Sequence, residues 1–177
     1  IVERGTRMPW YAGPTLLQHL EDVEVAPRAA KTMRLPVQWV NRPSQDFRGF
    51  SGTLAGGTVT VGDDIKVLPS GRKSKVRKLL LTDEDVASCA SGDALTLVLD
   101  DEIDISRGDV IASTDSDLRV ADQFAAHVIW LAEQHMLPGR AYWLKCGTQT
   151  VSATVTAVKH ALSVETGEEI ASRGLEL

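Results

Sequence analysis

The sequence predicts a mainly β protein that contains a small closed β-barrel, followed by part of a second β unit. Three observations predict this fold. Short runs alternate between apolar and polar residues, which is the pattern of half-buried strands. Beyond one short helical pattern near the N-terminus, the chain is β-like throughout. Glycine stands at the reversals between the runs, at Gly56-Gly57, Gly62, Gly71, Gly92 and Gly108. A closed barrel suits many short strands because it leaves no sheet edge open.

The helical pattern covers residues 14–25 and follows a turn at Gly13-Pro14-Thr15. Its apolar side chains recur at helical spacing, with acidic side chains facing away, at Leu16, Leu17, Leu20 and Val23. Such a face needs a surface on which to pack. Residues 1–7 are too few to supply one, so the pattern alone leaves that surface open.

Strands of the barrel are expected at residues 35–40, 50–54, 58–61, 65–68, 76–81, 94–99 and 110–112. The Gly-rich segment 52–58 is interpreted as a bend between two strands, because it lacks the lysine of a phosphate-binding loop. Arg107-Gly108-Asp109 is interpreted as a glycine turn before a strand. We place the barrel at residues 30–116.

The second unit covers residues 117–177 and looks incomplete. It has a strongly apolar segment at 124–131, a turn at 137–140 and expected strands at 142–146 and 150–159. A lone β unit of about 60 residues buries little surface. Because Gly174 to Leu177 has the pattern of a strand that begins, we expect the chain to be part of a longer protein at both ends.

Composition is that of an ordinary globular chain, with 177 residues of which 43% are hydrophobic and 24% charged. No apolar run is long enough to span a bilayer and no signal peptide is visible, so we expect a cytoplasmic protein with no membrane partner. Cys89 and Cys146 are too few and too distant for a disulfide scaffold, and both are expected to be buried, reduced thiols.

Charge is segregated along the chain, which carries a net charge of −5. The basic run Arg72 to Lys78 is followed by residues 82–104, where the charged side chains are all acidic, and the two stretches are able to complement one another. The basic run is either a phosphate or RNA patch or the solvated face of a strand whose lysines block edge-to-edge pairing. We favour the second interpretation, because no aromatic residue interleaves the run.

No catalytic or metal-binding residue is assigned. The four histidines show no metal-binding spacing, and the cluster Asp100 to Asp104 lacks the Gly and the distal Glu of a calcium loop. We interpret the histidines as structural and the acidic cluster as a solvated turn.

Several stretches together resemble one family. They are Met8-Pro9-Trp10-Tyr11 with Gly13 to Leu17, then Pro36 to Pro43, Asp46 to Thr53 and Asp101 to Asp109. With these residues the chain resembles the large, GTP-hydrolysing subunit of bacterial sulfate adenylyltransferase (ATP sulfurylase), a relative of the translation-elongation GTPases. That family has a GTPase domain followed by two barrels. The resemblance implies the end of the GTPase domain with a short linker helix at 1–29, an elongation-factor-like β-barrel (domain II) at 30–116 and an incomplete β-barrel (domain III) at 117–177.

The resemblance also implies a function. In that family the large subunit hydrolyses GTP, and a small subunit transfers the adenylyl group of ATP to sulfate, giving adenosine 5′-phosphosulfate and pyrophosphate. The barrels would be non-catalytic and would transmit the change driven by GTP hydrolysis. The GxxxxGK[ST] and Asn-Lys-x-Asp motifs are absent, so GTP and Mg belong to the parent protein and no cofactor is expected on this chain, which alone should be inactive. The expected partners are the GTPase domain of the same protein, which would also cover the helix, and the small catalytic subunit, in a heterodimer or larger assembly.

Interface residues are expected in the loop 41–49 and before the helix. The loop candidates are Arg42, Asp46, Phe47 and Arg48, since an exposed Phe beside Arg is a plausible anchor. The alternative is that Phe47 plugs one end of the barrel and Arg48 pairs near Asp46. Trp10 and Tyr11 would anchor the linker, with a structural role preferred. A different functional class stays open as well, namely a translational-GTPase barrel pair that binds tRNA or the ribosome, although the acidic net charge disfavours nucleic acid.

Overall fold

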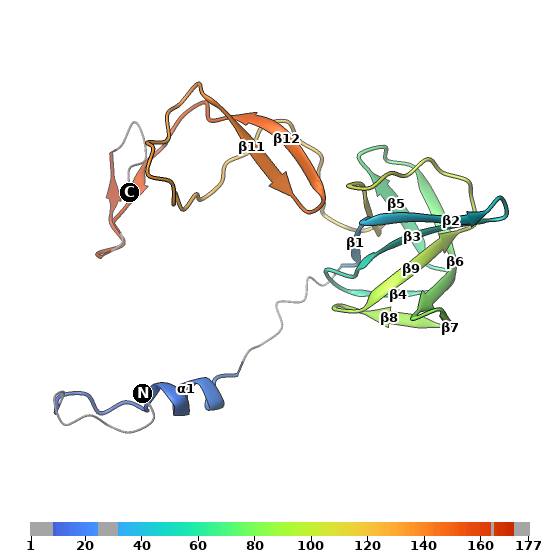
Figure 1. The fold of residues 1–177 in the computed structure, drawn as a ribbon, viewed down its shortest axis with the longest axis horizontal. Helices are drawn as coiled ribbons and strands as arrows, with labels where there is room; N and C mark the ends of the chain where they lie inside the picture. The colour runs from blue at the N-terminus through green and yellow to red at the C-terminus, as the bar shows by residue number, and fades with distance from the viewer. Residues whose placement is uncertain (1–8, 25–31, 164, 172–177) are drawn as a thin grey trace.

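The computed structural model describes residues 9–24, 32–163 and 165–171, and it contains one short helix, a barrel and a group of smaller β elements (Figure 1). Helix α1 (Leu16–Asp22) begins after Thr15, whose hydroxyl accepts a hydrogen bond from the Gln18 backbone N–H at 3.2 Å. None of its residues is buried. The helix expected from the sequence is therefore present but shorter, and its apolar face is exposed among the described residues.

The barrel is formed by β1 (Arg34–Pro36), β2 (Trp39–Ser44), β3 (Phe47–Thr53), β4 (Thr58–Thr60), β5 (Asp64–Leu68), β6 (Lys73–Leu81), β7 (Glu84–Val86), β8 (Ser88–Ala90), β9 (Ala94–Leu99) and β10 (Val110–Ser113). Its strands run in the order β1-β10-β5-β6-β9-β3-β2, with β7 paired to β6 and β4 paired to β8. β1 also bonds the chain that follows β3, since Arg34 N donates to Gly56 O at 3.2 Å and Ala55 N donates to Arg34 O at 2.8 Å. These bonds close the sheet on itself, and the predicted mainly β barrel fold is confirmed.

Alternate residues of the strands fill one core. Leu35, Val37, Val67, Leu79 and Leu97 have no measurable exposure. Burying a side chain of this size stabilises the fold by about 1.5–3 kcal/mol before the entropy cost is counted. The core sits inside the barrel, so residues of opposite parity on the same strands face outward and are available for contacts.

Turns with a Gly-Asp pair recur at the ends of the strands. At Thr60–Asp63, Ala90–Asp93 and Ser106–Asp109 the glycine has a φ of +95°, +102° and +100°, a region that favours glycine. In each turn the aspartate carboxylate accepts the backbone N–H three residues earlier, at 2.8, 2.8 and 2.9 Å. The turns expected at these glycines are therefore confirmed, and Arg107-Gly108-Asp109 is one of them.

One predicted strand divides in the structure, two begin three residues earlier than predicted, namely β3 and β6, and two further strands were not predicted. The run 35–40 divides into β1 and β2, because Val37 N donates to Asp109 O while Gln38 N donates to Ser51 O, so the chain changes its partner strand between them. β7 and β8 were not predicted, because they lie in the acidic stretch and have mostly exposed side chains. Val86 and Cys89 supply their inward contacts.

The chain enters and leaves the barrel at adjacent points. Ser113 N donates to Met33 O at 3.2 Å, and Arg34 pairs with Asp117 at 2.8 Å. Lys66 Nζ donates to Ser116 O at 2.6 Å, which fixes the segment after β10 against the outer face of β5. The departing chain is thus held beside the arriving one.

Beyond the barrel, β11 (Ala141–Cys146) and β12 (Gln149–Thr154) form a hairpin, and β13 (Ala161–Leu162) pairs with β14 (Glu169–Ile170). β11 was predicted closely, whereas β12 ends before the expected residue 159. The apolar segment 124–131 forms no strand and is largely exposed, with Ile129 at 86%. The boundaries at residues 29 and 116 stay predictions. Within the described residues, no helix is long and apolar enough to cross a bilayer.

Candidate interaction site

The β2–β3 hairpin carries four of the residues predicted to form an interface. Trp39 pairs with Ser51, Val40 with Phe50 and Ser44 with Phe47, with an irregularity between Asn41 and Ser44. The tip extends beyond the barrel (Figure 1), and Arg42 and Asp46 are exposed there. Phe47 and Arg48 are only half-buried.

Arg48 packs against Phe50 of the core. Its guanidinium carbon lies 5.7 Å from the centroid of the Phe50 ring, and Phe50 is 2% exposed. The same guanidinium pairs with Asp104 at 3.0 Å, in the segment after β9. The alternative interpretation is therefore wrong for the ion pair of Arg48, whose partner is Asp104 and not the surroundings of Asp46.

Phe47 lies on the outer face of the sheet. A Cβ atom added to Gly49 would meet the Phe47 ring at 2.9 Å, so the ring lies over this glycine. Gly49 pairs with Val98, which is 2% exposed but outside the core cluster. Trp39 faces the same side, because its neighbour Val40 packs on the core, and it is 59% exposed. Trp39 was not among the interface residues predicted from the sequence. Its position next to the apolar Val40 in an alternating strand could have indicated that its side chain faces outward.

Trp10 and Tyr11 precede helix α1. Their rings pack edge to face with centroids 6.1 Å apart, and the Tyr11 hydroxyl donates to Pro14 O at 3.0 Å. These contacts shape the turn before the helix. Trp10 nevertheless stays 76% exposed. The contact of these two residues, and of the four hairpin residues, with another domain or subunit stays a prediction.

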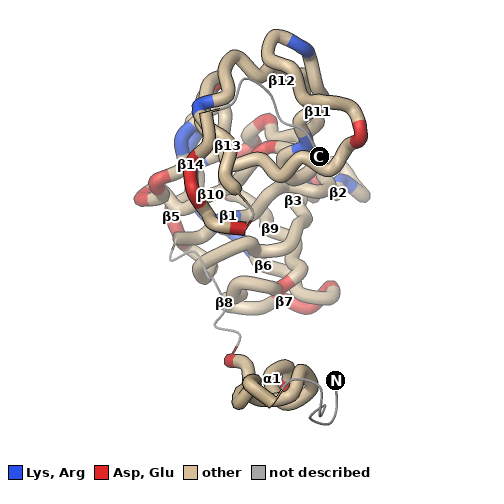
Figure 2. Tube along the Cα trace, turned by 90° about the vertical axis from the view of Figure 1, so that its left-hand side faces the viewer, with Lys and Arg blue, Asp and Glu red and all other residues tan. Residues whose placement is uncertain are grey.

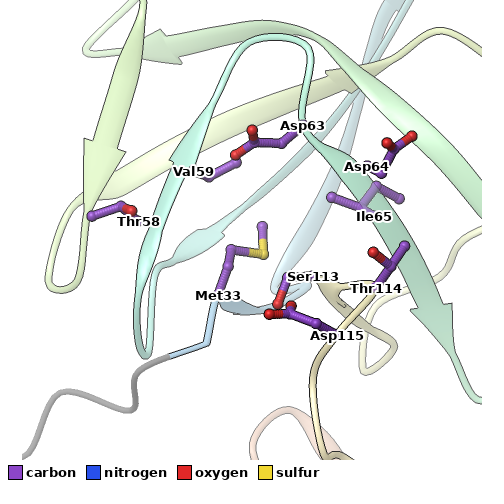
Figure 3. A pocket seen from close by; sticks show the side chains of 9 residues that line it. All are labelled: Met33, Thr58, Val59, Asp63, Asp64, Ile65, Ser113, Thr114 and Asp115. Carbon is purple, nitrogen blue, oxygen red and sulfur yellow. The ribbon is translucent and has the colours of Figure 1, made fainter.

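A pocket of about 270 Å³ opens between the β4–β5 turn and the chain after β10 (Figure 3). Met33 and Ser113 lie on one side of it and Asp63 on the other, while Asp64 points away from the centre. Asp63 already accepts the Thr60 N–H, and Asp64 pairs with Lys75 at 2.8 Å. Among the described residues no group of His, Cys, Asp and Glu has the arrangement of a metal site. We assign this pocket no chemistry.

The two cysteines differ. Cys89 is buried, and burial raises the pKa of its thiol, with a further contribution from the charge of Asp93. Cys146 is exposed at the end of β11, so the prediction that both thiols are buried is wrong for Cys146. The reason is that the β11–β12 hairpin has few side chains packed on it.

The basic run Arg72 to Lys78 covers the turn before β6 and the first part of that strand. The acidic stretch 82–104 supplies the ion-pair partner of one of its lysines. Lys78 pairs with Asp85 of β7 at 2.8 Å, and acidic residues mark the β7 region in Figure 2. Lys75 pairs instead with Asp64 of β5, whose hydrogen bond and charge raise the pKa of that lysine. The Asp101 carboxylate accepts a hydrogen bond from the buried Ser74 hydroxyl at 2.7 Å. This contact gives the acidic cluster a structural role.

Sequence comparisons show which known proteins this chain is similar to. Residues 123–177 match the family described as GTP-eEF1A C-terminal domain-like. The whole chain is 51% identical to the bifunctional enzyme CysN/CysC of Xylella fastidiosa, of which it covers 29%. It is 46% identical, again over its whole length, to sulfate adenylyltransferase subunit 1 of Laribacter hongkongensis, of which it covers 37%. The chain therefore spans about a third of the length of these relatives.

Solved structures share the fold. Sup35 complexed with GMPPNP matches 93% of this chain and 41% of its own, with a TM-score of 0.69 and 20% identity. Translation elongation factor SelB from Methanococcus maripaludis matches 90% of this chain and 35% of its own, with a TM-score of 0.69 and 25% identity. The chain is thus homologous along its length to part of sulfate adenylyltransferase subunit 1 and of the related bifunctional enzymes, and it has the β-barrel fold of the translational GTPases.

Proposed function

We propose that this chain is the non-catalytic barrel region of the GTPase subunit of a sulfate adenylyltransferase. Its role is to pass the conformational change driven by GTP hydrolysis to the small subunit, which makes adenosine 5′-phosphosulfate and pyrophosphate from ATP and sulfate. The observation that carries this proposal is the homology of the whole chain to subunit 1 of that enzyme. Coupling is needed because this mixed anhydride forms from ATP strongly uphill.

Two contacts support a mechanical role, because they join the β11–β12 hairpin and the barrel. The Thr148 hydroxyl donates to Val37 O at 3.0 Å, immediately after β1. The Gln149 side chain packs against Gly108 in the turn before β10. The Arg34–Asp117 pair holds the beginning of the connecting segment at the other end of β1. The two units would then rotate as one body against a GTPase domain.

The glycine-rich segment 52–58 does not fit the phosphates of GTP. The segment 52–58 is the most glycine-rich, but a Cβ atom added to Gly57 would meet the Met33 backbone N at 2.5 Å. That glycine therefore accommodates the approach of β1 and does not leave room for a phosphate. We assign nucleotide binding to the rest of the parent protein and derive no step through it here.

The outer face of the β2–β3 hairpin is our proposed contact with the GTPase domain. Phe47 and Trp39 supply apolar area on one face, and Arg42 lies at the exposed tip without an ion pair among the described residues. Arg48 acts indirectly, because its guanidinium is occupied by Phe50 and Asp104. Replacing Arg48 by Ala should weaken the coupling by loosening the base of the hairpin without unfolding the barrel.

The test uses the protein that carries this chain together with its small subunit. GTP should raise sulfate-dependent pyrophosphate release. The double substitution Thr148→Ala with Gln149→Ala should leave GTP hydrolysis intact and reduce this stimulation, because it removes the two contacts between the hairpin and the barrel. The matched control, Thr150→Ala with Ser152→Ala, changes two exposed residues of the same hairpin, and stimulation should persist. Lack of stimulation in the unmodified protein, or full stimulation in the Thr148 and Gln149 double variant, would show the proposal to be wrong.

A second candidate function is binding of tRNA or the ribosome. It is supported by cations on β6 that have no ion pair among the described residues, and by the likeness in fold to SelB. The absence of an aromatic residue from the run makes it the weaker candidate. Filter binding of labelled tRNA at several salt concentrations separates the two functions.

A further inference from the structure

The segment 100–109, which connects β9 to β10, forms no strand of its own but is anchored in the barrel core. Ile103 and Ile105 belong to the core cluster and are 5% and 2% exposed. The side chain of Asp104, which stands between them, is 89% exposed. The two isoleucines therefore fix the backbone on the barrel, while the carboxylate between them is available for a contact on the outside.

At its centre, the 100–109 segment holds the base of the β2–β3 hairpin. The Asp104 carboxylate accepts a hydrogen bond from the Arg48 guanidinium at 3.0 Å, and the same guanidinium lies 5.7 Å from the centroid of the Phe50 ring. Among the described residues, Arg48 forms no ion pair with another carboxylate. A displacement of the hairpin base therefore acts on this segment through Asp104.

At its end, the same segment supports the tip of the β11–β12 hairpin. Gly108 N donates to Val37 O at 2.9 Å, and the Thr148 hydroxyl donates to the same carbonyl at 3.0 Å. The Gln149 side chain occupies the space beside Gly108 that a Cβ atom would need. The hairpin of the second unit is thus seated where the 100–109 segment meets the end of β1.

The chain between these two contacts is short and has little slack. Asp104 and Gly108 are four residues apart, which is at most about 14 Å of extended chain. Ile105 is buried, and the turn after it is closed twice, because Ser106 N donates to the Asp109 carboxylate at 2.9 Å and Asp109 N donates to Ser106 O at 3.1 Å. A displacement at Asp104 is therefore not absorbed by a loose loop before it reaches Gly108.

We propose that the 100–109 segment links the β2–β3 hairpin mechanically to the β11–β12 hairpin, with Asp104 as a positioning residue that holds the hairpin base on the segment. The link rests on the proposed function and names the route by which a movement at the contact with the GTPase domain would reach the second unit. An exposed ion pair contributes little to stability, so the barrel should fold without it. Coupling between sites involves similarly small free energies, so its loss should be measurable there.

The experiment uses the protein that carries this chain together with its small subunit, and measures how much GTP stimulates sulfate-dependent pyrophosphate release. Asp104→Asn removes the charge but keeps the shape of the side chain, and should reduce the stimulation about two- to fivefold with GTP hydrolysis unchanged. Asp104→Glu keeps a carboxylate and should retain most of the stimulation. The matched control is Asp85→Asn, which removes the Lys78–Asp85 ion pair between β6 and β7 and should leave the stimulation unchanged.

A combined variant tests whether the two contacts lie on one route. Asp104→Asn is added to the double substitution Thr148→Ala with Gln149→Ala, which removes the contacts at the other end of the route. If the contacts act in series, the combined variant should lose no more stimulation than the more severe of its two parents. Losses that multiply would mean that the contacts act independently, and would overturn the link.

The remaining outcomes separate the link from the proposed function. If GTP stimulates the unmodified protein and Asp104→Asn, folded by circular dichroism, keeps the full stimulation, the link is wrong while the proposed function stands. If Asp104→Asn and Asp104→Glu lose stimulation equally, the carboxylate is not what matters and the positioning role of Asp104 is wrong. If GTP does not stimulate the unmodified protein, the proposed function fails and the link fails with it.

Discussion

Reactivity at the scale of single residues differs between the two cysteines. The Cys89 side chain is buried in the core cluster on β8, whereas Cys146 is exposed at the end of β11. Thiolate is the reactive form of cysteine, and burial disfavours it. The two thiols thus differ both in access and in the ease with which they ionise.

We predict that a thiol reagent at about pH 8 modifies Cys146 rapidly and Cys89 only after unfolding. Colorimetric titration should find one reactive thiol per folded chain and two in urea, matching the cysteine count of 2. The variant Cys146→Ser serves as the control and should show no fast reaction. Fast modification of Cys89 in that variant would contradict the buried position.

The raised pKa of Cys89 also sets a direction for stability. Above its ordinary value of 9.0, the unfolded chain loses this proton before the folded chain does. Stability from this group is therefore complete below that pH and falls as the pH rises toward the higher value in the folded state. Unfolding in urea above and below pH 9, compared with a Cys89→Ala variant, checks the sign.

At the scale of secondary-structure elements, the barrel closes because β1 approaches β3 closely. Gly52 of β3 faces the Pro36 carbonyl so closely that a Cβ atom there would overlap with it. The neighbouring bonds between Arg34, Ala55 and Gly56 complete the closure. A glycine at position 52 is needed for space, since its φ lies outside the left-handed region.

We expect Gly52→Ala to destabilise the barrel by about 2–3 kcal/mol, because backbone must move to admit the methyl group. Urea unfolding followed by tryptophan fluorescence gives the free energy. The comparison variant is Gly71→Ala, where no atom lies within 4 Å of the added Cβ but φ is +73°, so that only backbone strain of about 1–2 kcal/mol is introduced. Equal losses in the two variants would argue against a tight crossing.

The elements also show what the sequence can and cannot specify. Strands and Gly turns of the barrel were predictable, because alternation and positive φ are local properties. The break after Val37 was not predictable, because it depends on a change of partner strand. The same holds for Arg48, whose position over Phe50 depends on Asp104 in a distant segment. The exposure of the apolar segment 124–131 was not predictable either, because composition alone does not show whether a partner surface covers a segment.

Packing at the scale of the whole molecule is concentrated in the barrel. The core cluster consists entirely of residues between Met33 and Ile111. The β11–β12 hairpin has Trp143 80% exposed, and its partner-strand residue Val151 is exposed as well. Segments with few buried contacts open at low cost in free energy.

Hydrogen exchange should therefore divide the molecule into two parts. Backbone amides of β6 and β9 should exchange only through global unfolding, whereas those of β11 and β12 should exchange orders of magnitude faster. Mass spectrometry of peptic peptides measures both regions in one sample. Equal protection of the hairpin and the barrel strands would contradict this division. The substitution Thr148→Ala should accelerate exchange in the hairpin further, because it removes the hydrogen bond to Val37 O.

The adjacent entry and exit points of the barrel have a consequence for modularity. Because Arg34 and Ala112 are paired neighbours, the two ends of the barrel are separated by about one strand spacing, near 5 Å. A unit with ends this close can be grafted into a surface loop of another protein, or circularly permuted, with little strain on the host. The barrel can therefore be inserted as a unit into a longer chain. This fits the similarity of the chain to part of a longer bifunctional enzyme.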